Sequence, residues 1–290
     1  MRPDTKILSF FKAFGATGVE LPAIGQGTWN MPESGPHLKE ARRAIRRGIE
    51  LGMTHLDAAE MYGAGRVETL LGEAIRGIPR DRLFITTKVL PTNASFHGTL
   101  AAAERSIARL RCEYLDLYLL HWPGSQPLSE TMRALETLVE QGKSRFVGVS
   151  NFEASEMIEA ASFLRKTPLA CNQVLYHLDE RGIEHYVLPA ARERGIAVVA
   201  YTPFGRGSFL RSSARREVLE AVARKHAATP RQVALAFLIR DASVFAIPKA
   251  AQVAHVEENA AAGALTLDVD DVAAIDAAFP RGSAGPLATL

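Results

Sequence analysis

The sequence predicts an α/β fold of the (β/α)8 TIM barrel type, because three observations agree. Short runs rich in Val, Ile and Leu alternate with longer amphipathic runs, as is typical of parallel strands joined by helices. Eight strand-like runs recur roughly every thirty residues, the spacing of such a barrel. The length of 290 residues suits one barrel, so we expect a single domain over residues 1–290. The alternation alone leaves open a doubly wound sheet.

The individual elements follow from local residue patterns. Candidate strands, rich in β-branched and apolar residues, lie at residues 23–29, 54–59, 83–89, 114–121, 144–150, 170–174, 196–202 and 244–248. Helical patterns lie between and after them, at residues 38–52, 66–77, 100–111, 128–142, 153–166, 184–195 and 251–263. Several helices end at a glycine that suits a left-handed cap, as at Gly52, Gly142 and Gly195.

Three segments lie outside the repeat. The apolar stretch from Ile7 to Pro22 is predicted to form a β-hairpin across the barrel floor. The connection from Thr202 to about Thr229 is long and contains a helical run at residues 212–227, so we expect it to belong to the binding face. A further helix is predicted at residues 268–278.

The composition excludes several classes of partner. The formal net charge is +2 at pH 7 and the charges are interspersed, so we expect no nucleic acid partner. Cys112 and Cys171 lie in different units, which argues against a disulfide scaffold. No signal peptide and no apolar stretch of roughly 18 residues is present, so we expect a cytoplasmic protein without membrane contact. With no heptad pattern, a monomer is expected.

Four polar residues end, or closely follow, the predicted strands at residues 54–59, 83–89 and 114–121. They are Asp57, Tyr62, Lys88 and His121. In a parallel barrel these strand ends share one rim, so the side chains can meet in one pocket. A buried ammonium needs a partner, and Asp57 would pair with Lys88. Taken singly, each residue has an ordinary structural explanation, but their coincidence on successive strands favours catalysis.

The chemistry of this group is proton donation. A phenol has an ordinary pKa near 10, and a neighbouring ammonium lowers it. We therefore predict that Lys88 brings the pKa of Tyr62 toward the range in which a general acid is efficient. His121 is predicted to donate a hydrogen bond to a substrate carbonyl oxygen.

A second polar set follows the later strands. It consists of Ser150, Asn151, Gln173, Tyr201 and Lys249. Amides suit a carboxamide, a tyrosine face suits stacking, and a lysine suits phosphate. The set predicts a planar heteroaromatic ligand that carries phosphate.

The motifs that contain these residues resemble those of the aldo-keto reductase superfamily over nearly the whole chain. They are GQGTW at 25–29, LDAAEMYG at 56–63, TTK at 86–88, YLDLYLLHWP at 114–123, GVSNF at 148–152, NQV at 172–174, AIPKA at 246–250 and HVEEN at 255–259. The resemblance implies a (β/α)8 barrel that transfers hydride from NADPH to a carbonyl, with Tyr62 as the general acid. The nearest branch is that of bacterial methylglyoxal and 2,5-diketogluconate reductases, which implies small aldehydes such as methylglyoxal as substrates.

The resemblance also implies a cofactor site. Its residues would be Gly27, Thr28, Ser150, Asn151, Gln173, Tyr201, Thr202, Pro203, Phe204, Gly205, Lys249, Ala250, His255, Glu258 and Asn259. Thr202 to Gly205 would cover the pyrophosphate, and Lys249 would meet the 2′-phosphate. The sequence departs from the family at Ala250, where many members have Ser or Thr, and at His255, where many have Arg. Histidine lacks the bidentate fork of arginine, so NADH is expected to serve with lower preference. Trp29 and Trp122 would line the substrate pocket with Tyr62 and His121.

The sequence fits other dinucleotide-binding or metal-dependent functions less well. Gly25-Gln26-Gly27 lacks the third glycine of a Rossmann fingerprint. A metal-dependent barrel hydrolase needs ligands clustered at strand ends. Six of the eight histidines fall in predicted loops or helices, so no metal is expected; they are His37, His97, His177, His185, His226 and His255. An NADPH-binding redox-sensing subunit with slow turnover stays open as the alternative, although the four rim residues are all present.

Overall fold

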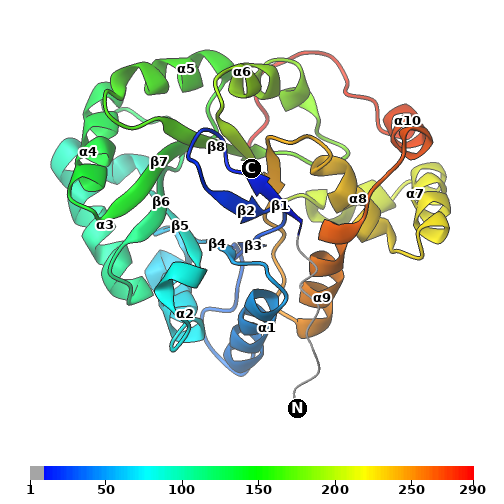
Figure 1. Cartoon of the computed structure of the whole chain (residues 1–290), viewed down its shortest axis with the longest axis horizontal. Helices are drawn as coiled ribbons and strands as arrows, with labels where there is room; N and C mark the ends of the chain where they lie inside the picture. The colour runs from blue at the N-terminus through cyan, green and yellow to red at the C-terminus, as the bar shows by residue number, and fades with distance from the viewer. Residues whose placement is uncertain (1–9) are drawn as a thin grey trace.

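The structure, a computed structural model, describes residues 10–290 and places a closed parallel barrel inside a ring of helices (Figure 1). Its sheet has eight strands in the order of the chain, each paired with the next. They are β3 Gln26–Gly27, β4 His55–Asp57, β5 Phe84–Val89, β6 Leu115–Leu120, β7 Ser144–Ser150, β8 Leu169–Leu175, β9 Ala197–Tyr201 and β10 Val244–Ala246. Each strand lies within or overlaps its predicted segment, although β3, β4 and β10 are shorter.

The first and last strands meet and close the sheet. The Gly25 amide donates to the Ala246 carbonyl at 2.8 Å, and the Gly27 amide donates to the Pro248 carbonyl at 3.1 Å. A Cβ atom on Gly27 would lie 2.4 Å from the Ile247 carbonyl oxygen, so only glycine permits this approach. Closure identifies a (β/α)8 barrel and rules out the doubly wound sheet.

The helices cover the outside of the barrel. The ring contains α1 Leu38–Glu50, α2 Arg66–Ala74, α3 Phe96–Leu110, α4 Leu128–Glu140, α5 Ala154–Phe163, α6 Val187–Glu193, α8 Pro230–Leu238 and α9 Val253–Ala261. Helix α1 packs against α9 and completes the ring. The predicted cap glycines Gly52, Gly142 and Gly195 all have positive φ, of 94°, 70° and 62°. None of the helices within residues 10–290 has the length and apolar character needed to cross a bilayer.

Helix α8 was not predicted, although its first turn carries a sequence signal. The Gln232 amide donates to the Thr229 hydroxyl at 3.3 Å, and the Thr229 amide donates to the Gln232 side chain at 2.9 Å. This reciprocal pair is a capping box, and Pro230 occupies the first helical position. The pattern Thr-Pro-x-Gln therefore identifies where the helix begins.

The predicted extra helices lie outside the ring. Helices α7 Ser213–Lys225 and α10 Val269–Ala278 pack against each other on one side of the barrel (Figure 1). The Lys225 ammonium donates to the Asp271 carboxylate at 2.8 Å, and His226 contacts the same carboxylate at 2.6 Å. These contacts link the end of α7 to the first turn of α10.

The barrel floor is closed by a hairpin of β1 Phe11–Ala13 and β2 Glu20–Pro22, which confirms the predicted element (Figure 1). The predicted start of this segment, at residues 7–9, lies outside the described residues. Phe14 of the hairpin is fully buried against Phe84 and Phe245 inside the barrel. The Lys12 ammonium donates to the carbonyls of Ile239, Asp241 and Val244 at 2.8, 2.8 and 2.6 Å.

Side chains alternate between the barrel interior and the layer beneath the helices. In β6, Leu117 and Leu119 join the interior cluster, whereas Tyr118 and Leu120 pack with the helices. The carboxyl ends of all the strands meet at the rim opposite the hairpin, and this rim is where the predicted site residues lie.

Candidate active site

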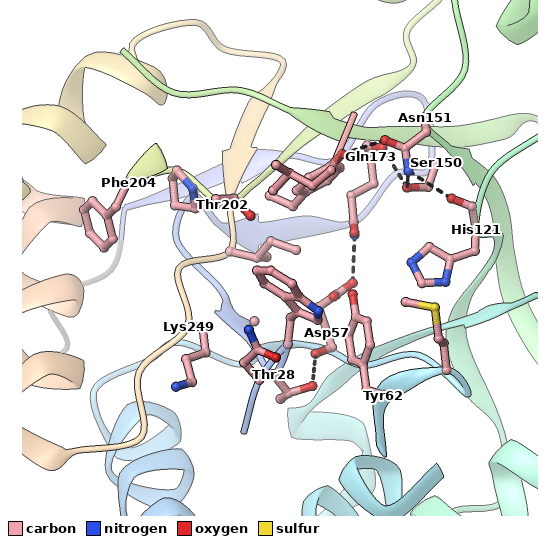
Figure 2. Close-up of a pocket in the computed structure, with 18 of the residues that line it drawn as sticks. Thr28, Asp57, Tyr62, His121, Ser150, Asn151, Gln173, Thr202, Phe204 and Lys249 are labelled. Carbon is pink, nitrogen blue, oxygen red and sulfur yellow. Dashed lines mark hydrogen bonds between the residues drawn. The ribbon is translucent and has the colours of Figure 1, made fainter. Parts of the chain in front are cut away.

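A cavity of about 380 Å³ opens at the rim, within the usual range of small-molecule sites (Figure 2). Most of the predicted site residues line it: Gly27, Thr28, Trp29, Asp57, Tyr62, His121, Trp122, Ser150, Asn151, Gln173, Tyr201, Thr202, Pro203, Phe204 and Lys249. Residues of seven strand ends and their loops thus converge on one space, as the shared rim of a parallel barrel requires.

Lys88 lies directly behind the cavity and joins two of its lining residues. Its fully buried ammonium donates to Asp57 Oδ1 at 2.7 Å, to the Ala58 carbonyl at 2.8 Å and to the Tyr62 hydroxyl at 3.3 Å. Burial is the largest single influence and disfavours the ammonium, but Asp57 and Tyr62 together outweigh it and raise the pKa of Lys88. Lys88 is therefore a fixed positive charge beside the phenol.

Asp57 is hydrogen-bonded to side chains on the adjacent strand β5 and on β8 across the barrel. Gln173 Nε2, on β8, donates to Asp57 Oδ2 at 2.7 Å, and the Thr28 hydroxyl donates to the Asp57 carbonyl at 2.7 Å (Figure 2). Asp57 and Gln173 are both almost fully buried. The sequence suggested Gln173 only as a cofactor contact, and its bond to Asp57 was not predicted.

Tyr62 departs from the predicted direction of its pKa. Burial raises the pKa of the phenol above its ordinary value, and the Lys88 ammonium offsets this only in part. The expectation that Lys88 would bring the pKa of Tyr62 down was wrong about the net direction, because it neglected desolvation. The phenol consequently stays protonated and is able to donate.

His121 faces Tyr62 and is uncharged. The two ring centroids lie 5.8 Å apart at 75°. Burial and the Lys88 charge lower the pKa of His121 to about 2. Its Nδ1 is buried and has no hydrogen-bond partner among residues 10–290. A neutral imidazole in this place can donate a hydrogen bond without adding a second charge beside Lys88.

The opposite wall is a connected set of polar groups. The Tyr201 hydroxyl donates to Asn151 Oδ1 at 2.7 Å, and Asn151 Nδ2 donates to the His121 carbonyl at 3.1 Å (Figure 2). The Ser150 hydroxyl donates to the Gln173 carbonyl at 2.8 Å. Asn151 has a φ of 62°, a left-handed conformation that is uncommon outside glycine. This backbone turns the amide toward the cavity.

The far end of the cavity is suited to an anion. Lys249 lies there, close to Thr28 in Figure 2, and has no charged partner among the residues that the structure describes. Burial lowers the pKa of Lys249. An unpaired lysine at one end, and amide and hydroxyl groups at the other, fit a ligand with a phosphate and a carboxamide. The donor set therefore fits a nicotinamide dinucleotide.

Some predicted cofactor residues lie beyond the cavity wall. Gly205 begins the short helix η5 Gly205–Leu210, Ala250 follows Lys249, and His255, Glu258 and Asn259 lie on α9. Within residues 10–290, they are not among the residues that line the cavity. The Glu258 carboxylate accepts from the Thr229 hydroxyl at 2.7 Å, so it ties α9 to the start of α8.

Five lining residues were not predicted: Asn30, Met61, Arg206, Ile247 and Leu290. Arg206 lies 5.1 Å above the Trp29 ring, in the long connection that was expected to join the binding face. Leu290 lies in the segment after α10 and was not predicted to reach the cavity. In the part of the chain that the structure describes, no group of three or more His, Cys, Asp or Glu side chains could hold a metal ion.

Comparison with known proteins agrees with this geometry. A model described as the aldo/keto reductase family matches residues 23–279. Methylglyoxal reductase YeaE of Escherichia coli is 44% identical over 263 residues, which cover 90% of this chain and 92% of that protein. Glyoxal reductase of Bacillus subtilis is 35% identical over 273 residues, which cover 93% of each chain.

Solved structures lead to the same family. The crystal structure of an aldo-keto reductase from Klebsiella pneumoniae in complex with NADPH matches with a TM-score of 0.89 and 38% identity, over 96% of this chain and 99% of that one. Sequence motifs, barrel and comparisons agree, and the chain belongs to the aldo/keto reductase family.

Proposed function

We propose that this chain reduces aldehydes and ketones to alcohols with NADPH, and that small aldehydes such as methylglyoxal are among its substrates. The observation that carries the proposal is the geometry of Tyr62, whose hydroxyl lies 3.3 Å from the buried Lys88 ammonium and whose ring faces the His121 imidazole inside a rim cavity. The names of the similar reductases from E. coli and B. subtilis support the substrate class.

Each side chain of the site has a separate role in the reduction, set by its position. His121 donates a hydrogen bond to the carbonyl oxygen and places it beside Tyr62. Tyr62 transfers its proton to that oxygen, and the Lys88 ammonium stabilises the phenolate that remains. Asp57 and Gln173 keep Lys88 in place. NADPH, bound along Ser150, Asn151 and Tyr201, would supply the hydride for the carbonyl carbon.

Lys249 is proposed to bind the 2′-phosphate of the cofactor. His255 offers neither a permanent charge nor a bidentate fork, so we expect NADPH to be preferred over NADH by a modest factor. Parallel kinetics with the two cofactors measures this factor. A preference of several thousand-fold would contradict the assigned role of His255.

The central test follows NADPH absorbance with methylglyoxal and a panel of aldehydes and ketones. Tyr62→Phe should lower kcat by roughly 10²–10⁴-fold. Tyr186→Phe is the matched control, because Tyr186 is exposed and lies away from the cavity. Turnover that survives Tyr62→Phe would refute the phenol as the acid, and a wild-type chain that reduces no carbonyl would refute the function.

A further inference from the structure

The loop between Asp57 and Tyr62 is bound to the strand that carries Lys88. The Ala58 amide donates to the Thr86 carbonyl at 2.9 Å, and the Glu60 amide donates to the Lys88 carbonyl at 3.2 Å. The loop thus continues the pairing of β4 with β5 beyond the last residue of β4. These backbone bonds do not by themselves fix the end of the loop, where Tyr62 lies.

The Glu60 side chain supplies this fixation. Its Oε1 accepts from the Leu90 amide at 2.7 Å and from Asn93 Nδ2 at 2.9 Å, and its Oε2 lies 3.7 Å from Arg105. The side chain is 6% exposed, so water competes little for these bonds. Bonds to a carboxylate are stronger than those between neutral groups. Glu60 therefore clamps the Tyr62 loop to the segment just after Lys88.

The clamped segment also contacts the third member of the site. The Val89 carbonyl, next to Leu90, accepts from the His121 amide at 3.0 Å. One stretch of backbone, from Lys88 to Leu90, is thus bonded to the Tyr62 loop on one side and to His121 on the other. Any shift of the loop relative to this stretch changes the distances from Tyr62 to both Lys88 and His121.

We propose that Glu60 is a positioning residue for proton transfer, holding the Tyr62 hydroxyl at its distance from the Lys88 ammonium and from His121. It touches neither the substrate site nor the phenol, and it acts through the loop. The inference rests on the proposed reductase function. A misplacement of about 1 Å at a reacting group can cost about 10²-fold in rate.

The test compares Glu60→Ala with Glu60→Gln. The glutamine oxygen can accept the same two bonds, so Glu60→Gln should keep kcat within about 3-fold, whereas Glu60→Ala should lower kcat by roughly 10- to 100-fold. The KM for methylglyoxal and the Kd for NADPH should change little in either variant. The solvent deuterium isotope effect on kcat should rise in Glu60→Ala, because proton transfer becomes slower.

Asp116→Asn is the matched control. Asp116 is a buried carboxylate that also accepts from a β5 backbone amide, that of Ile85 at 2.9 Å, but at the floor end of the barrel. This variant should lower the thermal midpoint and leave kcat within about 3-fold. If it lowers kcat as much as Glu60→Ala does, the effect is general destabilisation and the proposal is wrong.

A readout without cofactor or substrate separates this inference from the function. In the protein labelled with carbon-13 at tyrosine Cζ, the NMR signal of Tyr62 is identified by its loss in Tyr62→Phe. It should shift or broaden in Glu60→Ala and stay unchanged in Glu60→Gln. An unchanged Tyr62 signal in folded Glu60→Ala overturns the proposed role of Glu60, whatever the activity of the wild type. A wild type that reduces no carbonyl refutes the proposed function and leaves this test of Glu60 intact.

Discussion

The bond between Gln173 and Asp57 allows a quantitative test of the site electrostatics. Gln173→Glu changes one buried amide, whose nitrogen lies 2.7 Å from Asp57 Oδ2, into a group that can carry a second negative charge. Two buried carboxylates this close together cannot both ionise without a large loss of folding free energy. We expect Glu at this position to keep its proton up to about pH 7 and to donate it to Asp57 as the amide did.

The expected size follows from the geometry. Two unit charges relaxed to about 4 Å apart repel by about 4 kcal/mol at an effective dielectric of about 20. This corresponds to about 3 pKa units, which moves the new group from its ordinary value of about 4.3 to about 7. The folded chain then holds a proton that the unfolded chain has released. Stability relative to the wild type is therefore lost as pH rises from about 4.3 to about 7, by up to about 4 kcal/mol.

Urea unfolding of the wild type and of Gln173→Glu at pH 5, 6, 7 and 8 measures this loss. Gln173→Met is the control, since it removes the bond without adding a titrating group, and its loss of about 2 kcal/mol should not vary with pH. A constant difference between Gln173→Glu and the wild type across this range would show that Asp57 and residue 173 are not coupled, and would refute the reasoning.

Three further predictions concern stability. Burial lowers the pKa of His121 to about 2 and that of His55 to about 3. The free energy of unfolding should therefore fall below about pH 6.5, by up to about 1.4 kcal/mol per pH unit for each histidine. His121→Asn should reduce this slope, as measured by urea unfolding at pH 4.5–7. Lys12→Met should cost about 3 kcal/mol of unfolding free energy, because it leaves three carbonyls without their donor, while the Kd for NADPH by fluorescence stays constant. Tyr118→Phe should be neutral or raise the thermal midpoint, since the Tyr118 hydroxyl is buried without a partner among the described residues; a loss above about 1 kcal/mol would contradict this.

The rim constellation was accessible from the sequence because it depends on topology alone. Asp57, Lys88 and His121 each stand at or just beyond the end of a strand, and parallel strands of one barrel bring their ends together. The pairing of Asp57 with Lys88 followed from the cost of a buried charge. These inferences need only strand order and elementary electrostatics.

Other features depend on how the chain packs in three dimensions. Gln173 is 116 residues from Asp57 and reaches it across the barrel interior, a direction that strand patterns do not specify. The net pKa direction of Tyr62 depends on how deeply the phenol is buried. Helix α8 was not predicted, although the pattern from Thr229 to Gln232 indicates where it begins.

The bridge from Gln173 to Asp57 also bears on how the acid is recharged. Below it, most of the barrel interior is filled by apolar side chains such as Leu117, Leu119 and Phe245, and Phe14 closes the floor. The buried pair of His55 and Thr86 is a polar exception, and its two side chains bond each other at 3.2 Å. The cavity mouth is therefore the most direct route by which solvent protons would reach Tyr62. In the proposed reaction the product alcohol lies in that mouth, so renewal of the acid waits until the product has left. Proton supply and product release would then be coupled in a single kinetic event.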